Sequence, residues 1–306
     1  MYDDILYSGM NGNISVTIYK DGTTVREYDG NNIVPFQPLS IDMKITNKCF
    51  LDCEYCHEQS HKDGKHCDLE MMKKRFSGFQ KGTEIALGGG NIFLHPKLLD
   101  ILHYLKDELC CITNITIDSK TFIEHKNVLK GLQNKGLIYG IGISLKNYDI
   151  RYEKLRELKL IIRNKELKNI VFHLINGIHR FSDIILVQVL TKCPVLVLGY
   201  KDYGSGENYI LKNSSIVRCI MEENLKNVND FLENSQTIVS FDNRAIEQLK
   251  IKDLLTEEEW EDKYMGDEGQ FSMYYDAVED KYGVNSTSGR IPFSEDETII
   301  SVFEKL

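Results

Sequence analysis

The chain has 306 residues, a length that single α/β barrels commonly reach, and it carries 37 Lys and Arg against 46 Asp and Glu. The resulting net charge of −9 argues against nucleic acid as the main partner, because phosphate-backbone binding needs excess positive charge. The eight cysteines lack a secreted disulfide spacing, no apolar run approaches the roughly 18 residues of a membrane span, and no signal peptide is visible. We therefore expect a cytoplasmic protein with no membrane association.

Residues 1–38 are expected to form an N-terminal β-hairpin extension. Two runs of alternating apolar residues, 14–19 and 23–28, flank a Lys-Asp-Gly turn at 20–22. Asp-Gly between two such runs is a strong hairpin signal.

Residues 39–235 alternate between short apolar strands and amphipathic helices. Strands are predicted at 39–46, 83–88, 112–118, 138–145, 169–175 and 195–200. Helices are predicted at 69–80, 96–107, 121–135, 149–163, 180–192 and 215–234. Regular alternation with buried-type strands favours a parallel sheet. The expected fold class is therefore α/β, with residues 39–235 forming a partial (β/α)6 TIM-like barrel.

Residues 236–306 differ in composition and are expected to form a C-terminal cap that covers the substrate. Thr256 and Glu259 form a capping-box pattern, which predicts that a helix begins there. Residues 283–294 are rich in Gly, Ser, Thr and Pro and are predicted to form a loop. Within it, the polar segment 285–290 is a candidate lid over the barrel mouth.

Three cysteines follow the first predicted barrel strand with the spacing C-x3-C-x2-C: Cys49, Cys53 and Cys56. Active-site residues of such barrels lie at the carboxyl ends of strands. Three thiolates can hold three corners of an iron–sulfur cluster and leave one iron open for chemistry. The alternative is a zinc site, because thiolate and imidazole suit zinc as well as iron. Its further ligands would come from His57, His61, His66 and Cys67.

With Tyr55 before its last cysteine, this motif resembles the signature of the radical S-adenosylmethionine (SAM) superfamily. The second strand ends in Gly88-Gly89-Gly90-Asn91, which resembles the superfamily's Gly-Gly-Glu segment, whose backbone receives the amino group of SAM. Successive glycines let a backbone approach a ligand without a Cβ in the way. Asn91 stands where the superfamily usually has Glu, so its amide would bind the amino group of SAM without the help of a negative charge. The resemblance covers roughly residues 39–204.

The resemblance also implies binding residues further along the barrel. Ser144 and Lys146 follow the fourth strand, where the superfamily contacts the ribose or carboxylate of SAM. Asn176 follows the fifth strand and is the expected ribose or adenine partner. For Ser144 and Asn176, ordinary hydrogen bonding at a strand end is the alternative.

The cofactors implied are a [4Fe–4S] cluster on the three cysteines and SAM, with an external electron donor of the flavodoxin or ferredoxin type. Reductive cleavage of SAM would give a 5′-deoxyadenosyl radical that abstracts hydrogen from a substrate C–H bond. No auxiliary-cluster (SPASM-type) domain is expected, because no cysteine follows Cys219. Cys219, near the start of the sixth helix, is a candidate to return hydrogen to the substrate radical. The alternative is a buried thiol that packs as a small apolar residue.

The favoured substrate is a peptide or protein, because the acidic charge disfavours RNA and the N-terminal hairpin offers a strand edge to an extended peptide. A second hypothesis is radical SAM chemistry on a small molecule or nucleotide, with the C-terminal cap closing the barrel. A third is a non-catalytic zinc or iron–sulfur protein used for binding or sensing.

Overall fold

The computed structural model describes residues 4–20, 23–28, 33–234, 238–264 and 266–306. In these residues two sheets are present. The small one contains β1 (Ile5–Asn11), β2 (Ile14–Tyr19) and β3 (Thr24–Tyr28). The large one contains β4 (Ser40–Thr46), β5 (Glu84–Gly89), β6 (Ile112–Asp118), β7 (Ile141–Ser144), β8 (Ile170–Ile175), β9 (Val195–Leu198), β10 (Val239–Phe241), β11 (Ser272–Asp276), β12 (Lys281–Gly283) and β13 (Ile291–Pro292).

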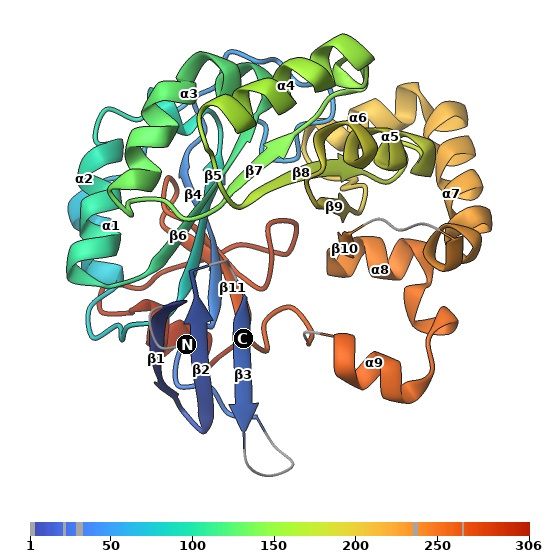
Figure 1. The fold of residues 1–306 in the computed structure, drawn as a ribbon. Coiled ribbons are helices and arrows are strands. Elements are labelled where there is room, and N and C mark those ends of the chain that lie inside the picture. Colours follow the sequence, from blue (N-terminus) through green and yellow to red (C-terminus); the bar gives the residue numbers. More distant parts are fainter. Residues whose placement is uncertain (1–3, 21–22, 29–32, 235–237, 265) are drawn as a thin grey trace.

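Helices connect the strands of the large sheet and cover its outer face (Figure 1). The α-helices are α1 (Leu69–Arg75), α2 (Leu98–His103), α3 (Ser119–Asn134), α4 (Tyr152–Asn164), α5 (Phe181–Thr191), α6 (Ser205–Lys212), α7 (Ser214–Asn234), α8 (Asn243–Leu249), α9 (Glu257–Lys263) and α10 (Ile299–Phe303). Short helical turns are η2 (Ile92–Leu94), η3 (Tyr104–Glu108), η4 (Asn147–Asp149) and η5 (Ile251–Leu254). No helix in these ranges is long and apolar enough to cross a membrane.

The large sheet is an open barrel with the strand order β10-β9-β8-β7-β6-β5-β4-β11-β12-β13. Neighbours from β10 to β11 pair in parallel, and β12 and β13 add an antiparallel edge. β10 and β13 are the two ends of this order and do not pair with each other. The α/β class and the partial TIM-like barrel predicted from sequence are thus confirmed.

The main hydrophobic core lies between the outer face of the barrel and its helices. Successive side chains of a strand point to opposite faces, so every second residue of β4 is directed outward. Ile41, Met43 and Ile45 are each no more than 1% exposed and pack in one cluster with Met72 of α1 and Leu132 of α3. Burying each such side chain contributes roughly 1.5–3 kcal/mol. The remaining residues of the strand therefore face the inside of the barrel.

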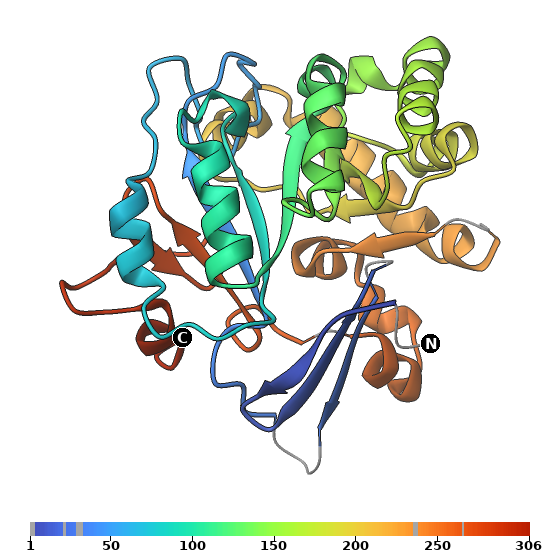
Figure 2. The same ribbon diagram turned by 60° about the vertical axis from the view of Figure 1, so that its left-hand side comes forward.

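The small sheet packs across the amino-terminal ends of the barrel strands (Figure 2). Ile14, Val16 and Ile18 of β2 are buried with Leu39 in a second cluster that also includes Ile112, the first residue of β6. The predicted hairpin is therefore part of a three-stranded sheet, β1-β2-β3. The turn expected at 20–22 includes residues 21–22, which lie outside the described residues.

The six predicted barrel strands correspond to β4 to β9, and the six predicted helices to α1 to α5 and α7. The structure adds α6 and two parallel strands, β10 and β11, so the parallel sheet extends beyond the predicted six units. The predicted helix start at Thr256 is confirmed, since its Oγ1 accepts a hydrogen bond from Glu259 N (3.2 Å) at the start of α9.

The segment 236–306, predicted as a cap, contributes strands to the barrel sheet itself. β10 lies beside β9, whereas β11 pairs with β4 on the opposite side. The boundaries 1–38, 39–235 and 236–306 remain a prediction about domain organisation.

Candidate active site

A cavity of about 1070 Å³ occupies the inside of the barrel. It extends from Ile18 in the small sheet to Gly88 and Ser144 at the carboxyl ends of β5 and β7. Ligand pockets are commonly about 300–1,000 Å³, so this space is large enough for more than one small molecule.

The inward-facing residues are unusually polar for a barrel core. Asp42 and Lys44 come from β4, Asn114 and Thr116 from β6, and His173 from β8, and all five line the cavity. The two residues of β4 and the two of β6 are each two positions apart, as the alternation of side chains along a strand requires. A polar wall inside an apolar shell indicates a binding site rather than a packed centre.

Three carboxylates face the cavity from separate elements: Asp42 from β4, Asp242 at the start of α8, and Glu268 ahead of β11. Burial raises the pKa of each carboxyl, and the ammonium of Lys201 opposes the rise in all three. Lys201 follows β9, and its Nζ donates to Ser286 Oγ at 2.8 Å. This part of the cavity is therefore rich in carboxyl groups that surround Lys201.

The cysteine loop, residues 47–67, leaves β4 at the carboxyl end of the barrel. Cys49 is buried, and Cys53 and Cys56 are half-buried. Cys56 N donates to Cys53 O at 3.1 Å, and Asp52 adopts a positive φ of 48°. Burial is the main cause that raises the pKa of Cys49 and of Cys53, and the neighbouring thiols raise it further. The three sulfur atoms thus share one local environment.

Two distant segments support this loop. Lys146 Nζ donates to Leu51 O at 3.3 Å and contacts Cys53, whose pKa it lowers against the effect of burial. At the start of α6, Ser205 N donates to Cys56 O at 3.0 Å. Lys146, expected from sequence to contact SAM, is therefore directed at the cysteine loop and is not among the residues that line the cavity.

Three of the four additional ligands considered for zinc contact other groups. His57 lies 3.5 Å from Glu58, His66 is hydrogen bonded to Thr46, and Cys67 lies 3.4 Å from His95. Across the described ranges, no three or more His, Cys, Asp or Glu side chains are placed to hold one metal ion. The thiolates of a cubane cluster each bind a different iron, so they need not converge on one point.

Tyr55 gives a further test of whether a cofactor fits beside the loop. Its ring packs edge-on against Tyr209 with centroids 5.4 Å apart. Its hydroxyl is buried and has no hydrogen-bond partner among the described residues. Buried polar atoms are normally paired, so an orphaned hydroxyl one residue before Cys56 is consistent with a missing ligand. The three thiols in one loop and this hydroxyl fit the expected cluster and SAM.

The glycine segment lies against the cysteine loop. Gly89 has a φ of 106°, and a Cβ there would overlap the Thr46 carbonyl oxygen; a Cβ on Gly90 would overlap that of Lys48. Gly88 lines the cavity, and a Cβ there would meet nothing within 4 Å. Gly89 and Gly90 are therefore required because a larger residue would collide with the neighbouring backbone. Gly88 has no such contact and leaves space in the cavity.

Asn91 and Asn176 have side chains that bind other protein groups. Asn91 Oδ1 accepts from Phe93 N (3.0 Å), and its Nδ2 donates to Thr121 (3.3 Å). Asn176 is 1% exposed, and its amide bonds Gln248 (3.1 Å) and Asn224 (2.9 Å). Neither lines the cavity, whereas Ser144 does. Of these predicted SAM-binding residues, Ser144 has the position that the prediction requires.

Cys219 lies on the exposed side of α7 and is not among the residues that line the cavity. A thiol that returns hydrogen to a substrate radical must reach the substrate, so this position gives the predicted donor no structural support. The alternative, a buried thiol that packs as a small apolar residue, is wrong, since the Cys219 side chain is exposed.

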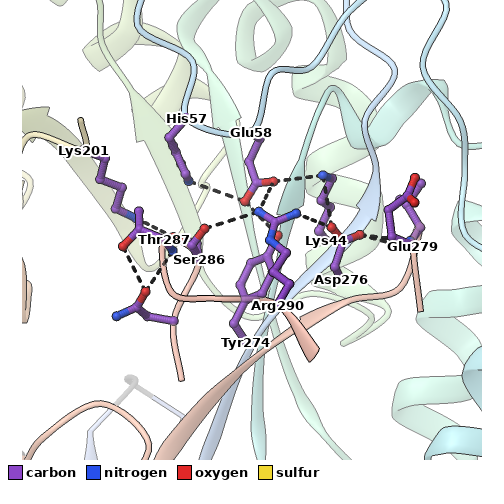
Figure 3. A network of polar contacts seen from close by, with 12 residues as sticks. Lys44, His57, Glu58, Lys201, Tyr274, Asp276, Glu279, Ser286, Thr287 and Arg290 are labelled. Carbon is purple, nitrogen blue, oxygen red and sulfur yellow. Dashed lines mark hydrogen bonds and ion pairs between the residues drawn. The ribbon is translucent and has the colours of Figure 1, made fainter. Parts of the chain in front are cut away.

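A closed ionic network, not anticipated from sequence, forms one wall of the cavity (Figure 3). Glu58 contacts Lys44 (3.0 Å) and Arg290 (3.1 Å), and Asp276 contacts the same two cations. Tyr274 donates its hydroxyl to Glu58 at 2.7 Å. Burial alone would raise the pKa of Glu58, but the neighbouring cations bring it to about 2. Glu58 is therefore ionised and paired at neutral pH.

The polar segment 285–290 lines the cavity with Asn285 and Ser286. Ser286 is held by Lys201 from the β9 side, and Arg290 by Asp276 from the β11 side. The candidate lid therefore bridges the open side of the barrel.

The fold and site thus define an α/β-barrel protein with a thiol-rich loop at the mouth of a polar internal cavity. Residues 43–187 match the family model of the Radical SAM superfamily. This part of the chain is therefore similar to the radical SAM enzymes, which use a [4Fe–4S] cluster and SAM.

Two curated relatives share parts of the sequence. A probable GTP 3′,8-cyclase of Methanocaldococcus jannaschii is 25% identical over 170 residues, 53% of this chain and 52% of the relative. The subtilosin biosynthesis protein AlbA of Bacillus subtilis is 29% identical over 127 residues, 40% of this chain and 27% of the relative. The matches thus span about half of one relative and a quarter of the other.

The same fold occurs in SuiB of Streptococcus suis. SuiB bound to the precursor peptide SuiA superposes with a TM-score of 0.58 at 12% identity, covering 95% of this chain and 85% of SuiB. SuiB bound to S-adenosylmethionine gives 0.53 at 14% identity, covering 89% and 64%.

Proposed function

We propose that this protein is a radical SAM enzyme that acts on a peptide or protein. Cys49, Cys53 and Cys56 bind the cluster, with Tyr55, Gly88 and Ser144 beside the SAM that completes it. Cluster and SAM together supply a 5′-deoxyadenosyl radical that abstracts hydrogen from the substrate. The chain's own residues position SAM and substrate and keep water away from the reacting atoms.

The observation that carries a peptide substrate is the size and charge of the cavity. At about 1070 Å³ it has room for a substrate segment beside a cofactor. The oxygens of Asp42, Asp242 and Glu268 can accept hydrogen bonds from the amide and ammonium donors of a peptide, whereas these residues offer no positive charge to the phosphates of a nucleotide. AlbA and the SuiB complex with its precursor peptide support this choice.

Chemistry on a nucleotide is the second candidate, since the M. jannaschii relative is a probable GTP 3′,8-cyclase. The electron donor, of flavodoxin or ferredoxin type, remains part of the proposal in either case.

The first test asks whether the chain cleaves SAM. Anaerobically reconstituted protein, reduced with dithionite, is expected to release 5′-deoxyadenosine, and Cys56→Ala is expected to release none. The matched control is Cys110→Ala, because Cys110 lies in the turn between η3 and β6, outside the cysteine loop. Equal release from wild type and Cys56→Ala would contradict the cluster assignment.

The second test identifies the substrate class by isotope transfer. The reduced enzyme is incubated with SAM and either a uniformly deuterated peptide digest or deuterated nucleotides. We expect deuterium in 5′-deoxyadenosine from the peptides, because hydrogen moves directly from substrate to the radical. Label from the nucleotides instead would favour the second candidate.

Cys219 stays a predicted hydrogen donor. If Cys219→Ala keeps the wild-type turnover and product stereochemistry, the thiol has no such role.

A further inference from the structure

We infer that Glu58 is a positioning residue that holds the third cysteine of the loop in place for the cluster, with the C-terminal strands as its support. The inference rests on the proposed cluster at Cys49, Cys53 and Cys56. Glu58 lies two residues after Cys56, and its side chain is only 6% exposed.

Two of the contacts of Glu58 come from regions far away in the sequence. Lys44 belongs to β4, Tyr274 to β11, and Arg290 precedes β13 (Figure 3). Glu58 is 216 residues from Tyr274 and 232 from Arg290. β11 and β13 lie outside the range 43–187 that matches the family model, so this support is a feature of the remaining chain.

The backbone around Cys56 is also held by the start of α6. Cys56 O accepts hydrogen bonds from Ser205 N (3.0 Å) and Gln59 N (3.3 Å). Gly204 approaches so closely that a Cβ would lie 3.0 Å from the same carbonyl oxygen. The backbone is therefore held at the Cys56 carbonyl by the start of α6 and, two residues later, by the contacts of the Glu58 side chain.

Stability alone is a weak reason for such a network. Lys44, Glu58, Arg290 and Asp276 form a neutral ring in which each carboxylate contacts both cations. Replacing buried ion pairs with apolar residues often leaves the stability of a protein unchanged or raises it. Ion pairs with several partners do, however, fix the orientation of each side chain. Arg290 also stacks on Tyr274, with its guanidinium 4.9 Å from the ring centroid. The arrangement therefore fixes the direction of Glu58, and through it the adjacent cysteine.

The test compares Glu58→Gln with Glu223→Gln. Glu223 also pairs with an arginine, Arg180 at 2.9 Å, but on the surface and far from the loop in sequence. Each protein is reconstituted with iron and sulfide, freed of excess iron, and mixed with an iron chelator. The decay of visible cluster absorbance is followed well below the melting temperature of each apoprotein.

We expect Glu58→Gln to release its cluster about 10- to 100-fold faster than wild type, the range typical for outer partners of metal ligands. Glu223→Gln should match wild type. Wild-type cluster lifetime in Glu58→Gln, even with a lowered melting temperature, would overturn the inference and leave Glu58 a stabilising residue only. Failure of the wild type to bind any cluster would instead overturn the proposed function.

A second variant covers the case in which Glu58→Gln does not fold. The double substitution Glu58→Met with Arg290→Leu removes one anion and one cation, so the remaining Lys44 and Asp276 still form a pair. Folding is checked by far-UV circular dichroism. Fast cluster release from this folded protein supports the inference, and wild-type release contradicts it.

Discussion

Gly89 and Gly88 are neighbours in sequence, but the structure makes different demands on them. Gly89 has a φ of 106° and touches the Thr46 carbonyl, whereas Gly88 has an ordinary φ and open space where a Cβ would point. Gly89 therefore sets how closely β5 approaches the end of β4, where the cysteine loop begins. Gly88 affects only what can enter the cavity.

For this reason we expect Gly89→Ala to lower the free energy of unfolding by at least about 2 kcal/mol, from backbone strain and overlap. Gly88→Ala is the matched control and should change it by less than about 1 kcal/mol. Urea denaturation of the two apoproteins measures both values. Equal effects would show that the close approach at Gly89 is not required.

His179 is a buried residue with an incomplete set of partners. It is 1% exposed, and its Nδ1 accepts from Ile175 N at 2.9 Å. Its Nε2 has no partner among the described residues. Burial lowers the pKa of His179 to about 4, so the folded protein holds the neutral imidazole.

The unfolded chain binds a proton at this histidine near pH 6.5, while the folded protein does so only near pH 4. The contribution of His179 to the free energy of unfolding is therefore at its full value above pH 6.5. It decreases by about 2–4 kcal/mol as the pH falls from 6.5 to 4. His179→Asn keeps an acceptor for Ile175 and should flatten the profile over this interval. Denaturation at several pH values tests this. His103→Gln, at an exposed site, should keep the wild-type slope.

At the scale of elements, the strands of the barrel were predictable because each is a compact apolar run. β4 at Ser40–Thr46 was expected at 39–46, and β6 at Ile112–Asp118 was expected at 112–118. α6 was missed because Gly204 and Gly206 favour a loop; Gly204, with a φ of 61°, instead precedes the helix as its N-cap. β10 has only three residues, too few to show a pattern.

The site was predictable where its residues are close in sequence. The cysteines are recognisable from their spacing, although their role remains a prediction. Lys44 is a charged residue within an otherwise largely apolar strand, and this position indicates that the inside of the barrel is polar. Its pairing with Asp276, 232 residues away, cannot be read from a single sequence, because nothing local links the two. The network around Glu58 therefore emerged only from the structure.

Loss of one member of this network should be costly, because it leaves buried charge unpaired. We expect Arg290→Met to lower the free energy of unfolding by about 3–5 kcal/mol at neutral pH, since Glu58 and Asp276 each lose a cation. Arg180→Met breaks an exposed pair and should cost less than about 1 kcal/mol. Chemical denaturation of the apoproteins compares them. Similar small losses in both would mean that the ionic ring contributes nothing to folding.

At the scale of the whole molecule, β10 and β11 place the C-terminal segment on both sides of the barrel sheet. The single tryptophan, Trp260, lies in α9 between them and stacks on Tyr264 with centroids 4.1 Å apart. Its fluorescence therefore reports on this segment, while circular dichroism is dominated by the barrel helices.

We expect both signals to change at the same denaturant concentration, because the barrel cannot keep its edges without β10 and β11. Coincident transitions would show that residues 236–306 fold together with the barrel. An earlier tryptophan transition would make this segment an independent unit.

The pairing of β11 with β4 also determines the order in which the molecule assembles. β5 to β10 each lie beside the strand that precedes them in sequence, so these contacts form over short stretches of chain. Ser40 and Ser272 meet only after a loop of more than two hundred residues closes, which is entropically costly and slow. Folding of this edge should therefore come last. In a partly folded chain the cysteine loop would exist before β11 and Arg290 are in place to hold Glu58. Iron delivered at that stage would bind to a loop that lacks this support and would be lost more readily.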